Sequence, residues 1–367
     1  MAVEQNVTSP PPPVSYQSNT PTHPKRTYHR KKSIKQKDID TVLVVNPNSS
    51  SGLTGKGWND LYSEIKGVLG ASVEVALTKK PGDGTTLARH FLKQGFKKVV
   101  AIGGDGTLNE VANGFFEEPV GIHSNKINGR PAGFPPFKPI NPDAIMGVVP
   151  AGTRNVLAKS LGLPEGIANC CKTFQFGKPK KMDVIYVTVT SQEDRSSTTS
   201  RIFLNAAEMG VAGEIIERSK KVRQVVNSRI VSTITSIAAT LPTYQSNECE
   251  ISIGNNRKKF AIKMTMAVVA NGQFLGGGFK AAPHASMSDG LLDLVILKDS
   301  GSLKMIDELI NMKDGDYKEE DNITYRQTTK VSLTSKERDV TVTVDGEPIG
   351  ILPATFEVIP HALTIRM

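Results

Sequence analysis

The sequence predicts an α/β fold in two parts, a mainly parallel α/β domain followed by an antiparallel β-sandwich domain. Between residues 39 and 182, short apolar runs alternate with amphipathic helical stretches, which is the pattern of βαβ units. From residue 183 to 367, runs rich in β-branched residues follow one another with turn residues between them. A chain of 367 residues can bury a core in each domain, and the return of the C-terminal residues to the first domain is left open.

Residues 1–38 precede these domains as a basic, proline-rich tail. They carry seven lysines and arginines against Glu4 and Asp38, which is a net charge of +5 out of the chain's +9. Such a segment has too few apolar residues to fold, so we expect it to be disordered. A solvated tail is the commonest outcome for such a run, and attraction to an anionic lipid surface is the functional alternative.

The rest of the composition is typical of a protein from a reducing compartment. Cys170, Cys171 and Cys249 have neither the spacing of a disulfide framework nor that of a zinc site. No run reaches the ~18 apolar residues of a membrane span, and the N-terminus lacks the apolar core of a signal peptide. We therefore expect a cytoplasmic protein that contacts membranes peripherally.

Four apolar runs in the first domain are predicted as parallel strands, namely "TVLVVN", "VEVALT", "VVAIGG" and "AIMGVVP". Helices are predicted over residues 58–69 and about 84–94, where apolar residues recur at helical spacing. A further helix is expected to start at Thr107, because Thr107 and Glu110 have the spacing of a capping box.

Small polar residues or glycines follow each of these strands, at Asn46, Thr78, 103–107 and 151–153. The carboxyl ends of parallel strands meet at one edge of a sheet, and ligands bind there. Glycines let the backbone approach a ligand closely, and the free N–H groups of a helix start attract an anion. The sequence therefore predicts an anion site at this edge. The alternative is a turn whose glycines only save space.

The second domain is predicted from a series of strand-like runs with a few interruptions. The runs are "DVIYVTVT", "RIFLNAA", "CEISIG", "FAIKMTMAVVANG", "LLDLVIL", "KVSLTS" and "DVTVTVDGEPIG". Residues 190–201 are predicted as a polar loop and residues 214–240 as a basic helical stretch. In the first domain, residues 117–143 are predicted as a long Pro-, Gly- and Asn-rich loop, which in a compact domain is functional or disordered.

Several common motifs are missing. "GLTGKG" lacks the spacing and the Ser/Thr of a P-loop, and "GGDGTL" is not the G-x-G-x-x-G of a dinucleotide fold. No histidine pair has metal spacing, and no Ser/His/Asp set can be assembled. Phosphate chemistry without a Walker motif remains.

Five motifs together resemble those of the diacylglycerol-kinase catalytic domain family, which includes sphingosine and ceramide kinases and the bacterial soluble lipid kinases. They occur in the family's order from about Asp40 to the C-terminus: "VVNPNSSSG", "GGDGTLNEVANG", "VPAGTRNVLA", "VANGQFLGGGFKAAPHASMSDGLLDLVIL" and "VTVDGE". The resemblance implies a nucleotide-binding α/β domain, a β-sandwich domain, and an active site with ATP in the cleft between them.

The resemblance also assigns site residues. Asp105 would lie near the magnesium and the γ-phosphate, and Glu347 would accept the proton of the lipid hydroxyl. A placed base of this kind typically contributes 10²–10⁴-fold. The nucleotide would be bound by Asn46, Pro47, Asn48, Ser49, Ser50, Thr78, Gly104, Asp105, Gly106, Thr107, Leu108, Asn109, Glu110 and Thr153. Each has a structural alternative: Asn46–Ser50 could be a plain turn, Glu110 a helix cap and Glu347 a surface carboxylate.

A structural magnesium site is implied at "SMSDGLLD", with the Asp289 carboxylate and the carbonyls of Ser286 and Leu291 as ligands. One carboxylate with carbonyls and waters suits a hard cation. The alternative is that residues 288–290 are a hairpin turn between strands.

Three functions stay open on the sequence. The first is an ATP- and Mg²⁺-dependent lipid kinase acting on diacylglycerol or a related long-chain alcohol at a membrane surface. The others are a kinase related to NAD kinase, and a non-catalytic protein that binds lipid or nucleic acid through its tail. The terminal "DGE" favours the first, and no nucleic-acid partner is expected. The lipid and the occurrence of a homodimer are not predicted.

Overall fold

The structure is a computed structural model that describes residues 39–50, 52–70, 72–117, 138–226, 228–255, 259–317 and 322–367. The predicted tail and most of the loop predicted over 117–143 lie outside the described residues.

Helices and strands alternate in the first part of the chain and strands dominate the second. The described helices are α1 (Leu53–Lys56), α2 (Trp58–Leu69), α3 (Asp83–Lys93), α4 (Asp105–Asn113), α5 (Val156–Ser160), α6 (Ile167–Phe176), α7 (Val211–Val222), α8 (Arg229–Thr240), α9 (Ser302–Asp314) and the 3₁₀ turn η1 (Gly276–Gly278). The described strands are β1 (Thr41–Val45), β2 (Glu74–Leu77), β3 (Lys98–Gly103), β4 (Ile145–Pro150), β5 (Pro179–Thr190), β6 (Thr198–Phe203), β7 (Ala206–Gly210), β8 (Asn247–Ile253), β9 (Lys259–Ala270), β10 (Leu292–Lys298), β11 (Ile323–Thr328), β12 (Lys330–Ser335), β13 (Thr341–Val344) and β14 (Glu347–Arg366).

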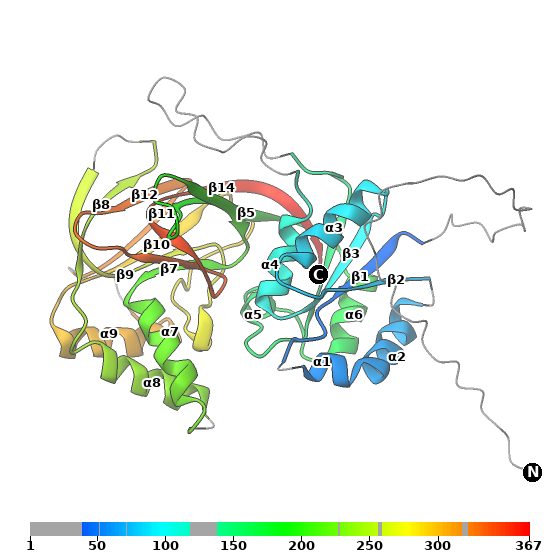
Figure 1. The fold of residues 1–367 in the computed structure, drawn as a ribbon, viewed down its shortest axis with the longest axis horizontal. Coiled ribbons are helices and arrows are strands. Elements are labelled where there is room, and N and C mark those ends of the chain that lie inside the picture. The colour runs from blue at the N-terminus through cyan, green and yellow to red at the C-terminus, as the bar shows by residue number, and fades with distance from the viewer. Residues whose placement is uncertain are drawn as a thin grey trace, which may run out of the picture.

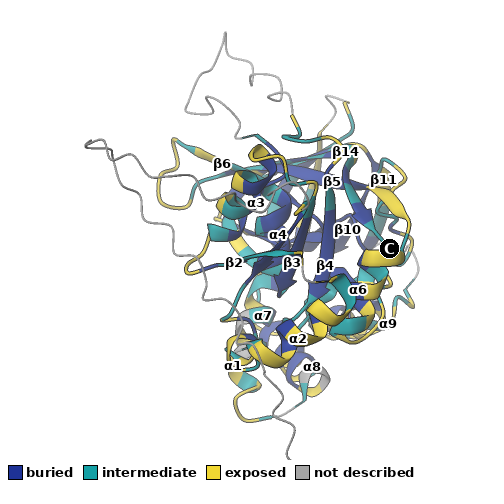
Figure 2. Ribbon diagram, turned by 90° about the vertical axis from the view of Figure 1, so that its right-hand side faces the viewer, coloured by how far each residue is buried: buried dark blue, intermediate teal, exposed yellow. Residues whose placement is uncertain are grey.

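The first domain is a parallel sheet of order β2-β1-β3-β4 with helices on both faces, as predicted. Helices α3 and α4 cover one face and helices α2 and α6 the other (Figure 2). Side chains on both faces of the sheet are buried. The central strands β1 and β3 consist mostly of buried β-branched residues and alanine. This is why these strands appear in the sequence as continuous apolar runs rather than as alternating ones.

The second domain is an antiparallel sandwich, also as predicted. Its inner core joins side chains of β5, β6, β12 and β14 to those of β7, β9, β10 and β13, with Phe203 and Phe356 packed edge to face between them. Helices α7, α8 and α9 pack against the outer face of β9 and β10 and form a second apolar layer there (Figure 1).

Strand β14 physically joins the two domains. It pairs with β13, β12 and β5 inside the sandwich and then runs on to pair with β4, where Ile365 lies beside Met146. The strands of the described residues therefore belong to one 14-stranded hydrogen-bonded sheet, and the C-terminus lies in the first domain (Figure 1). The two domains are therefore joined through one continuous hydrogen-bonded sheet.

Three local predictions need correction. The helical stretch predicted over 214–240 is two antiparallel helices, α7 and α8, with a turn between them. The predicted polar loop over 190–201 is a hairpin that already belongs to β6 from Thr198. Helix α9 was not predicted, although Met305, Leu309 and Met312 recur at helical spacing. No helix in the described ranges is both long and apolar enough to cross a membrane.

Candidate functional site

The carboxyl ends of the parallel strands open onto a polar cavity of about 550 Å³. Its walls come from both domains: the loops after β1, β2, β3 and β4 on one side, and β7 with the β13–β14 turn on the other. The predicted residues that line it are Asn46, Asn48, Ser49, Ser50, Thr78, Gly104, Asp105, Gly106, Thr107, Glu110, Thr153 and Glu347. The prediction that the strand ends converge on one site is thus confirmed geometrically.

The loop after β1 is held in place by its own side chains. Asn46 accepts the N–H of Asn48 at 2.9 Å and donates to the Thr107 hydroxyl at 2.9 Å, which ties β1 to α4. Ser50, at a positive φ of 51°, donates to the carbonyl of Ala151 at 2.9 Å. These contacts place polar groups of three strand ends against one another before any ligand binds.

Glycines bring the loops after β3 and β4 into direct backbone contact. A β-carbon on Gly152 would collide with the α-carbon of Gly104, so the loop after β4 could not carry a side chain at this approach. Helix α4 then starts at Asp105 with Gly104 as its N-cap and no side chain bonded to its first N–H groups. These N–H groups open onto the cavity, which suits a phosphate.

Asp105 lines the cavity at the first position of α4. Its Oδ1 accepts the backbone N–H of Leu157 at 3.0 Å, which fixes the carboxylate relative to α5. Within the described residues Oδ2 makes no hydrogen bond, so one carboxylate oxygen remains as an acceptor beside the glycine loop.

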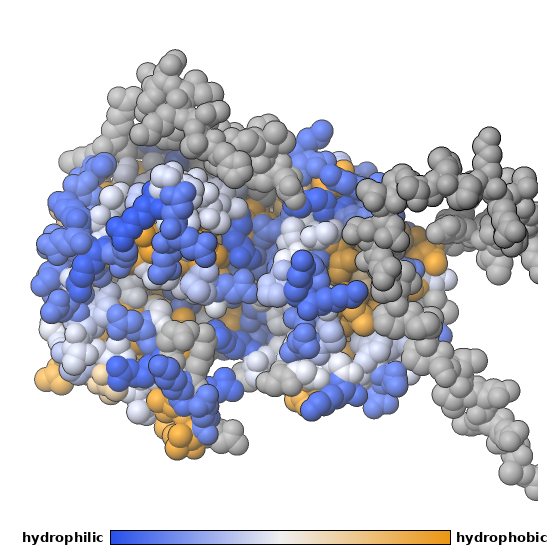
Figure 3. All heavy atoms as spheres, in the orientation of Figure 1, coloured by the Kyte–Doolittle hydropathy of each residue, from blue (hydrophilic) through white to orange (hydrophobic). Residues whose placement is uncertain are grey.

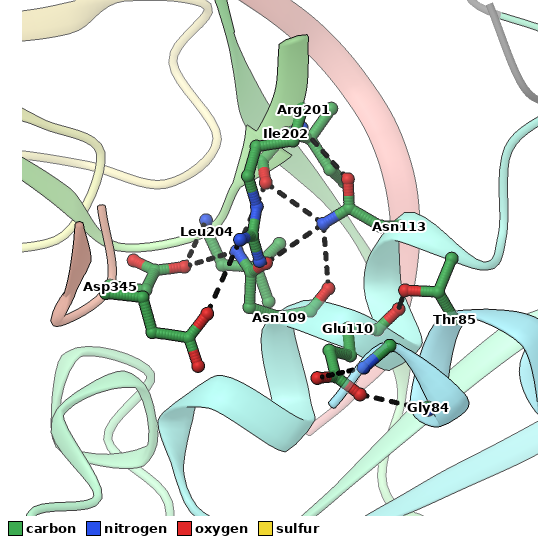
Figure 4. Close-up of polar contacts among 11 residues, drawn as sticks. Gly84, Thr85, Asn109, Glu110, Asn113, Arg201, Ile202, Leu204 and Asp345 are labelled. Atoms are coloured by element: carbon green, nitrogen blue, oxygen red, sulfur yellow. Dashed lines mark hydrogen bonds and ion pairs between the residues drawn. The ribbon is translucent and has the colours of Figure 1, made fainter. Parts of the chain in front are cut away.

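Glu110 does not form the predicted capping box, although it lines the cavity with other residues of the predicted nucleotide set. Helix α4 begins two residues before Thr107, so Thr107 and Glu110 lie too far inside the helix to form a capping box. Glu110 instead accepts the N–H groups of Gly82 and Gly84 at 2.8 and 2.9 Å and so caps the neighbouring helix α3 (Figure 4). This carboxylate holds α3 against α4.

Glu347 reaches the cleft from the second domain. It follows the Asp345-Gly346 turn between β13 and β14, whose positive φ angles of 46° and 87° belong to a tight hairpin. A β-carbon on Gly106 would collide with its Oε1, so this carboxylate lies directly against the first turn of α4. Arg201 approaches its Oε2 at 3.4 Å, and 46% of the Glu347 side chain is exposed.

Asp345 anchors this hairpin. Its half-buried carboxylate accepts four N–H groups: Leu204 at 3.0 Å, Asn205 at 2.9 Å, Ala206 at 3.2 Å and the Asn109 side chain at 2.7 Å (Figure 4). Burial raises the pKa of Asp345, and the four donors oppose that rise. The turn that carries Glu347 is thereby fixed to both domains.

Three residues of the predicted nucleotide set do not line the cavity. Leu108 lies in the core of the first domain because it faces away from the cleft on α4. Asn109 is buried, and its amide group donates hydrogen bonds to the Asp345 carboxylate and to the Ile202 carbonyl. Pro47 lies behind the loop, where its carbonyl accepts the N–H of Gly55.

The predicted metal ligands Ser286, Asp289 and Leu291 lie outside the cleft, in the segment before β10. Asp289 is exposed, and its Oδ1 accepts the N–H of Leu291 at 3.0 Å. The hairpin alternative is wrong, since β9 ends at Ala270. The exposed carboxylate suits a hydrated hard cation, and the described residues hold no cluster of three acidic, histidine or cysteine side chains.

A second cavity of about 460 Å³ adjoins the polar one. It lies between β9 and the helices α7, α8 and α9. Its apolar lining comes from Val156, Ala212, Ile215, Ile216, Ile237, Met266, Phe274, Leu275, Phe279, Ala281, Leu309 and Met312. The two cavities share only Arg154, Val156, Glu208 and Gly276 among the described residues.

The sequence analysis assigned no role to Arg154 or Glu208. Arg154 stands in the quoted "AGTRN" motif, and a β-carbon on Gly276 or Gly346 would lie 3.2 Å from its Nη1. A charged residue within a glycine-rich phosphate loop was a signal that could have marked it. Glu208 gave no such signal, because its strand neighbours are apolar.

Comparisons with known proteins match this architecture. The model of the diacylglycerol kinase catalytic domain matches residues 40–187, and that of the YegS C-terminal NAD kinase beta sandwich-like domain matches residues 206–367. The chain therefore carries a diacylglycerol kinase catalytic domain followed by a YegS-type C-terminal domain. The match covers both walls of the cleft, which confirms the resemblance stated from the sequence.

The individual relatives are distant from this chain in sequence. The chain is 25% identical to a diacylglycerol kinase of Bacillus subtilis strain 168 over 321 residues, covering 86% of this chain and 91% of the relative. It is 27% identical to a protein of Chromohalobacter salexigens named "Probable lipid kinase YegS-like" over 323 residues, covering 85% and 88%. A diacylglycerol kinase structure from Bacillus anthracis superimposes with a TM-score of 0.61 at 20% identity, covering 90% of this chain and 98% of that one, which shows the fold.

Proposed function

We propose that the protein transfers the γ-phosphate of ATP to the hydroxyl of a long-chain lipid alcohol such as diacylglycerol. The observation that carries this proposal is the apolar cavity that adjoins the polar cleft and shares lining residues with it. A lipid chain buried there would leave its polar end beside Glu347 and the glycine loop. A soluble dinucleotide acceptor has no chain to bury in such a cavity.

The nucleotide phosphates would bind at the start of α4 and at the loop after β4. N–H groups of 104–107 and the Thr153 region line this part of the cleft, and Lys79 and Lys80 supply positive charge after β2. Magnesium in phosphoryl-transfer sites is typically held by one or two carboxylates together with phosphate oxygens and water. Asp105, with one oxygen unbonded within the described residues, fits that role, and the ion would supply charge neutralisation.

In this proposal Glu347 accepts the proton of the attacking hydroxyl. An alcohol is a weak nucleophile at neutral pH, so a positioned base assists its attack. The ion pair with Arg201 and the rigid turn anchored by Asp345 hold the Glu347 carboxylate against α4. Positioning and charge on the phosphates would supply the remaining acceleration.

The proposed acceptor requires access to a membrane, and the turn between α7 and α8 offers a peripheral contact. Val225 is 88% exposed there, and the exposed cations Arg218, Lys221 and Arg223 surround it. Figure 3 shows an apolar patch bordered by hydrophilic side chains at this lower end of the second domain. Arg223 also lines the apolar cavity, so this face lies at its entrance. The basic tail would add attraction to anionic lipid from a cytoplasmic location.

The experiment that tests the proposal supplies labelled ATP and Mg²⁺ with a total lipid extract, with diacylglycerol, and with NAD in parallel. We expect a labelled lipid and no labelled dinucleotide. Labelling of NAD alone would favour the related dinucleotide kinase. Binding of lipid without any ATP-dependent labelling would favour the non-catalytic alternative.

A further inference from the structure

Glu208 occupies the boundary between the polar cleft and the apolar cavity. It lies on β7, is only 6% exposed, and lines both cavities. Among the described residues that line the apolar cavity it is the one acidic side chain. A carboxyl group in such surroundings is costly unless something donates a hydrogen bond to it.

Few groups in the described part of the chain stabilise the charged form of Glu208. It forms no ion pair within 4 Å there, and the groups that stabilise its charged form are the Arg154 guanidinium and the N–H of Gly276. Burial nevertheless raises the pKa of Glu208 to about 7, with the nearby charge of Asp345 acting in the same direction. The two protonation states are therefore close in energy, and a bound donor would favour the carboxylate.

Glu208 and Glu347 line the same polar cavity from strands of one sheet. Glu208 pairs with Thr343 on β13, and Val344, the next residue of β13, pairs with Glu347 across the turn. Two strand spacings separate their backbones, which is about 10 Å. A lipid with its hydroxyl at Glu347 and its chain in the apolar cavity must pass its first few backbone atoms beside Glu208.

We propose that Glu208 is a specificity residue that accepts a hydrogen bond from a second donor on the lipid, a hydroxyl or an ammonium group next to the phosphorylated hydroxyl. This inference rests on the proposed lipid kinase function. It disfavours diacylglycerol, whose backbone beside the free hydroxyl carries only ester oxygens. Those oxygens accept hydrogen bonds and would face the ionised carboxylate without a proton between them.

The test compares three acceptors in one detergent at fixed surface concentration: 1-oleoylglycerol, 2-aminooctadecan-1-ol and 1,2-dioleoylglycerol. They offer a second hydroxyl, an ammonium group and no second donor. For the wild type we expect kcat/KM with at least one donor-bearing lipid to exceed that with dioleoylglycerol by tenfold or more, because a site built to bind a donor rejects an analogue without it. The first two lipids show which donor is preferred.

Glu208→Leu should remove this preference by lowering kcat/KM at least about tenfold for the preferred lipid while sparing dioleoylglycerol. Glu208→Gln, which keeps the shape, should lower the preference in the same direction and serves if the leucine variant does not fold. Exposed Glu337→Gln is the matched control and should leave all three values unchanged.

The pH dependence provides a second readout. In the wild type the preference for a donor-bearing lipid should rise from pH 6 to 8.5 as Glu208 ionises, and it should be flat in Glu208→Gln. A wild type that prefers dioleoylglycerol, or a Glu208→Leu that lowers all three values equally, overturns the inference while leaving the lipid kinase proposal intact. Phosphorylation of none of these lipids overturns both.

Discussion

Glu347 of the second domain and Gly106 of the first lie in contact across the cleft, and this contact fixes how close the Glu347 carboxylate lies to helix α4. A β-carbon on Gly106 would collide with Oε1 of Glu347. Asp345 fixes the turn that carries Glu347, and Arg201 forms an ion pair with the Glu347 carboxylate. The proposed base and the proposed phosphate loop therefore have a fixed separation that single substitutions can disturb.

Gly106→Ala should impair phosphoryl transfer by at least about tenfold, since displacing a reacting group by about 1 Å can cost 10²-fold. The fold should survive, because the added methyl group displaces an exposed side chain rather than the core. Kinetics with the preferred lipid, together with a melting temperature, measure the effect. Gly67→Ala on α2, where a β-carbon meets nothing within 4 Å, is the control and should keep full activity. Equal activity of the two variants contradicts the proposed contact.

Glu110→Ala should act mainly on stability. Its carboxylate caps α3 through Gly82 and Gly84, and loss of a helix cap costs about 0.5–2 kcal/mol. We expect a lower midpoint in denaturant unfolding, with the KM for ATP changed only a few-fold. Lys79 and Lys80, which line the same part of the cleft, give the comparison: alanine there should raise the KM for ATP and leave the midpoint unchanged. A large rise in KM for Glu110→Ala with an unchanged midpoint would restore it to the nucleotide set.

Glu208 predicts a specific dependence of stability on pH. Its pKa is raised from 4.5 to about 7 by burial, so the folded state binds the proton more tightly than the unfolded state. The free energy of unfolding contributed by this group therefore falls as pH rises from about 4.5 to about 7. Glu208→Gln cannot titrate and should gain stability relative to the wild type over that interval. Melting temperatures of both proteins between pH 4.5 and 8 measure it, and parallel curves would show that the group does not titrate there.

Asp289 distinguishes a magnesium site from a plain turn. Removing its carboxylate leaves the N–H of Leu291 without its acceptor, at a cost of about 0.5–1.5 kcal/mol. If a cation binds there, millimolar Mg²⁺ should raise the melting temperature of the wild type and should not rescue Asp289→Ala. Ser288→Ala, at the neighbouring exposed position, should respond to Mg²⁺ like the wild type. A melting temperature that responds equally to Mg²⁺, or not at all, in the wild type and in Asp289→Ala would leave the turn as the explanation.

The sequence predicted those parts of the fold whose signal is local. Strands β1 and β3 and helix α2 were predicted within a residue because their apolar spacing is unambiguous. The capping box predicted for Thr107 and Glu110 is wrong, because the Glu110 carboxylate accepts N–H groups at the start of the neighbouring helix α3 instead. Local spacing cannot distinguish a carboxylate that caps its own helix from one that caps a neighbouring helix.

Residue spacing and sheet geometry alone predicted the candidate site on one side only, and Glu347 on the opposite wall was assigned through the family resemblance. Glycines and small polar residues at strand ends marked the phosphate side, where the convergence follows from sheet geometry. Glu208 and Arg154 are brought together only by the fold, which places β7, the loop after β4 and the turn at Gly346 side by side. The apolar cavity depends on the packing of α7, α8 and α9 over β9, and the prediction of a single helical stretch concealed it.

The central claim is that Glu347 accepts the proton of a lipid hydroxyl as phosphate is transferred. Its most direct test is the single-turnover rate of transfer from labelled ATP to the preferred lipid by wild type and Glu347→Gln, with ATP affinity measured alongside. Glutamine keeps the size of the side chain and removes its basicity. We predict a rate lower by about 10²–10⁴-fold with ATP affinity changed only a few-fold. A transfer rate near that of the wild type, with chemistry shown to limit it, would contradict the claim and leave Glu347 as a surface carboxylate beside a turn.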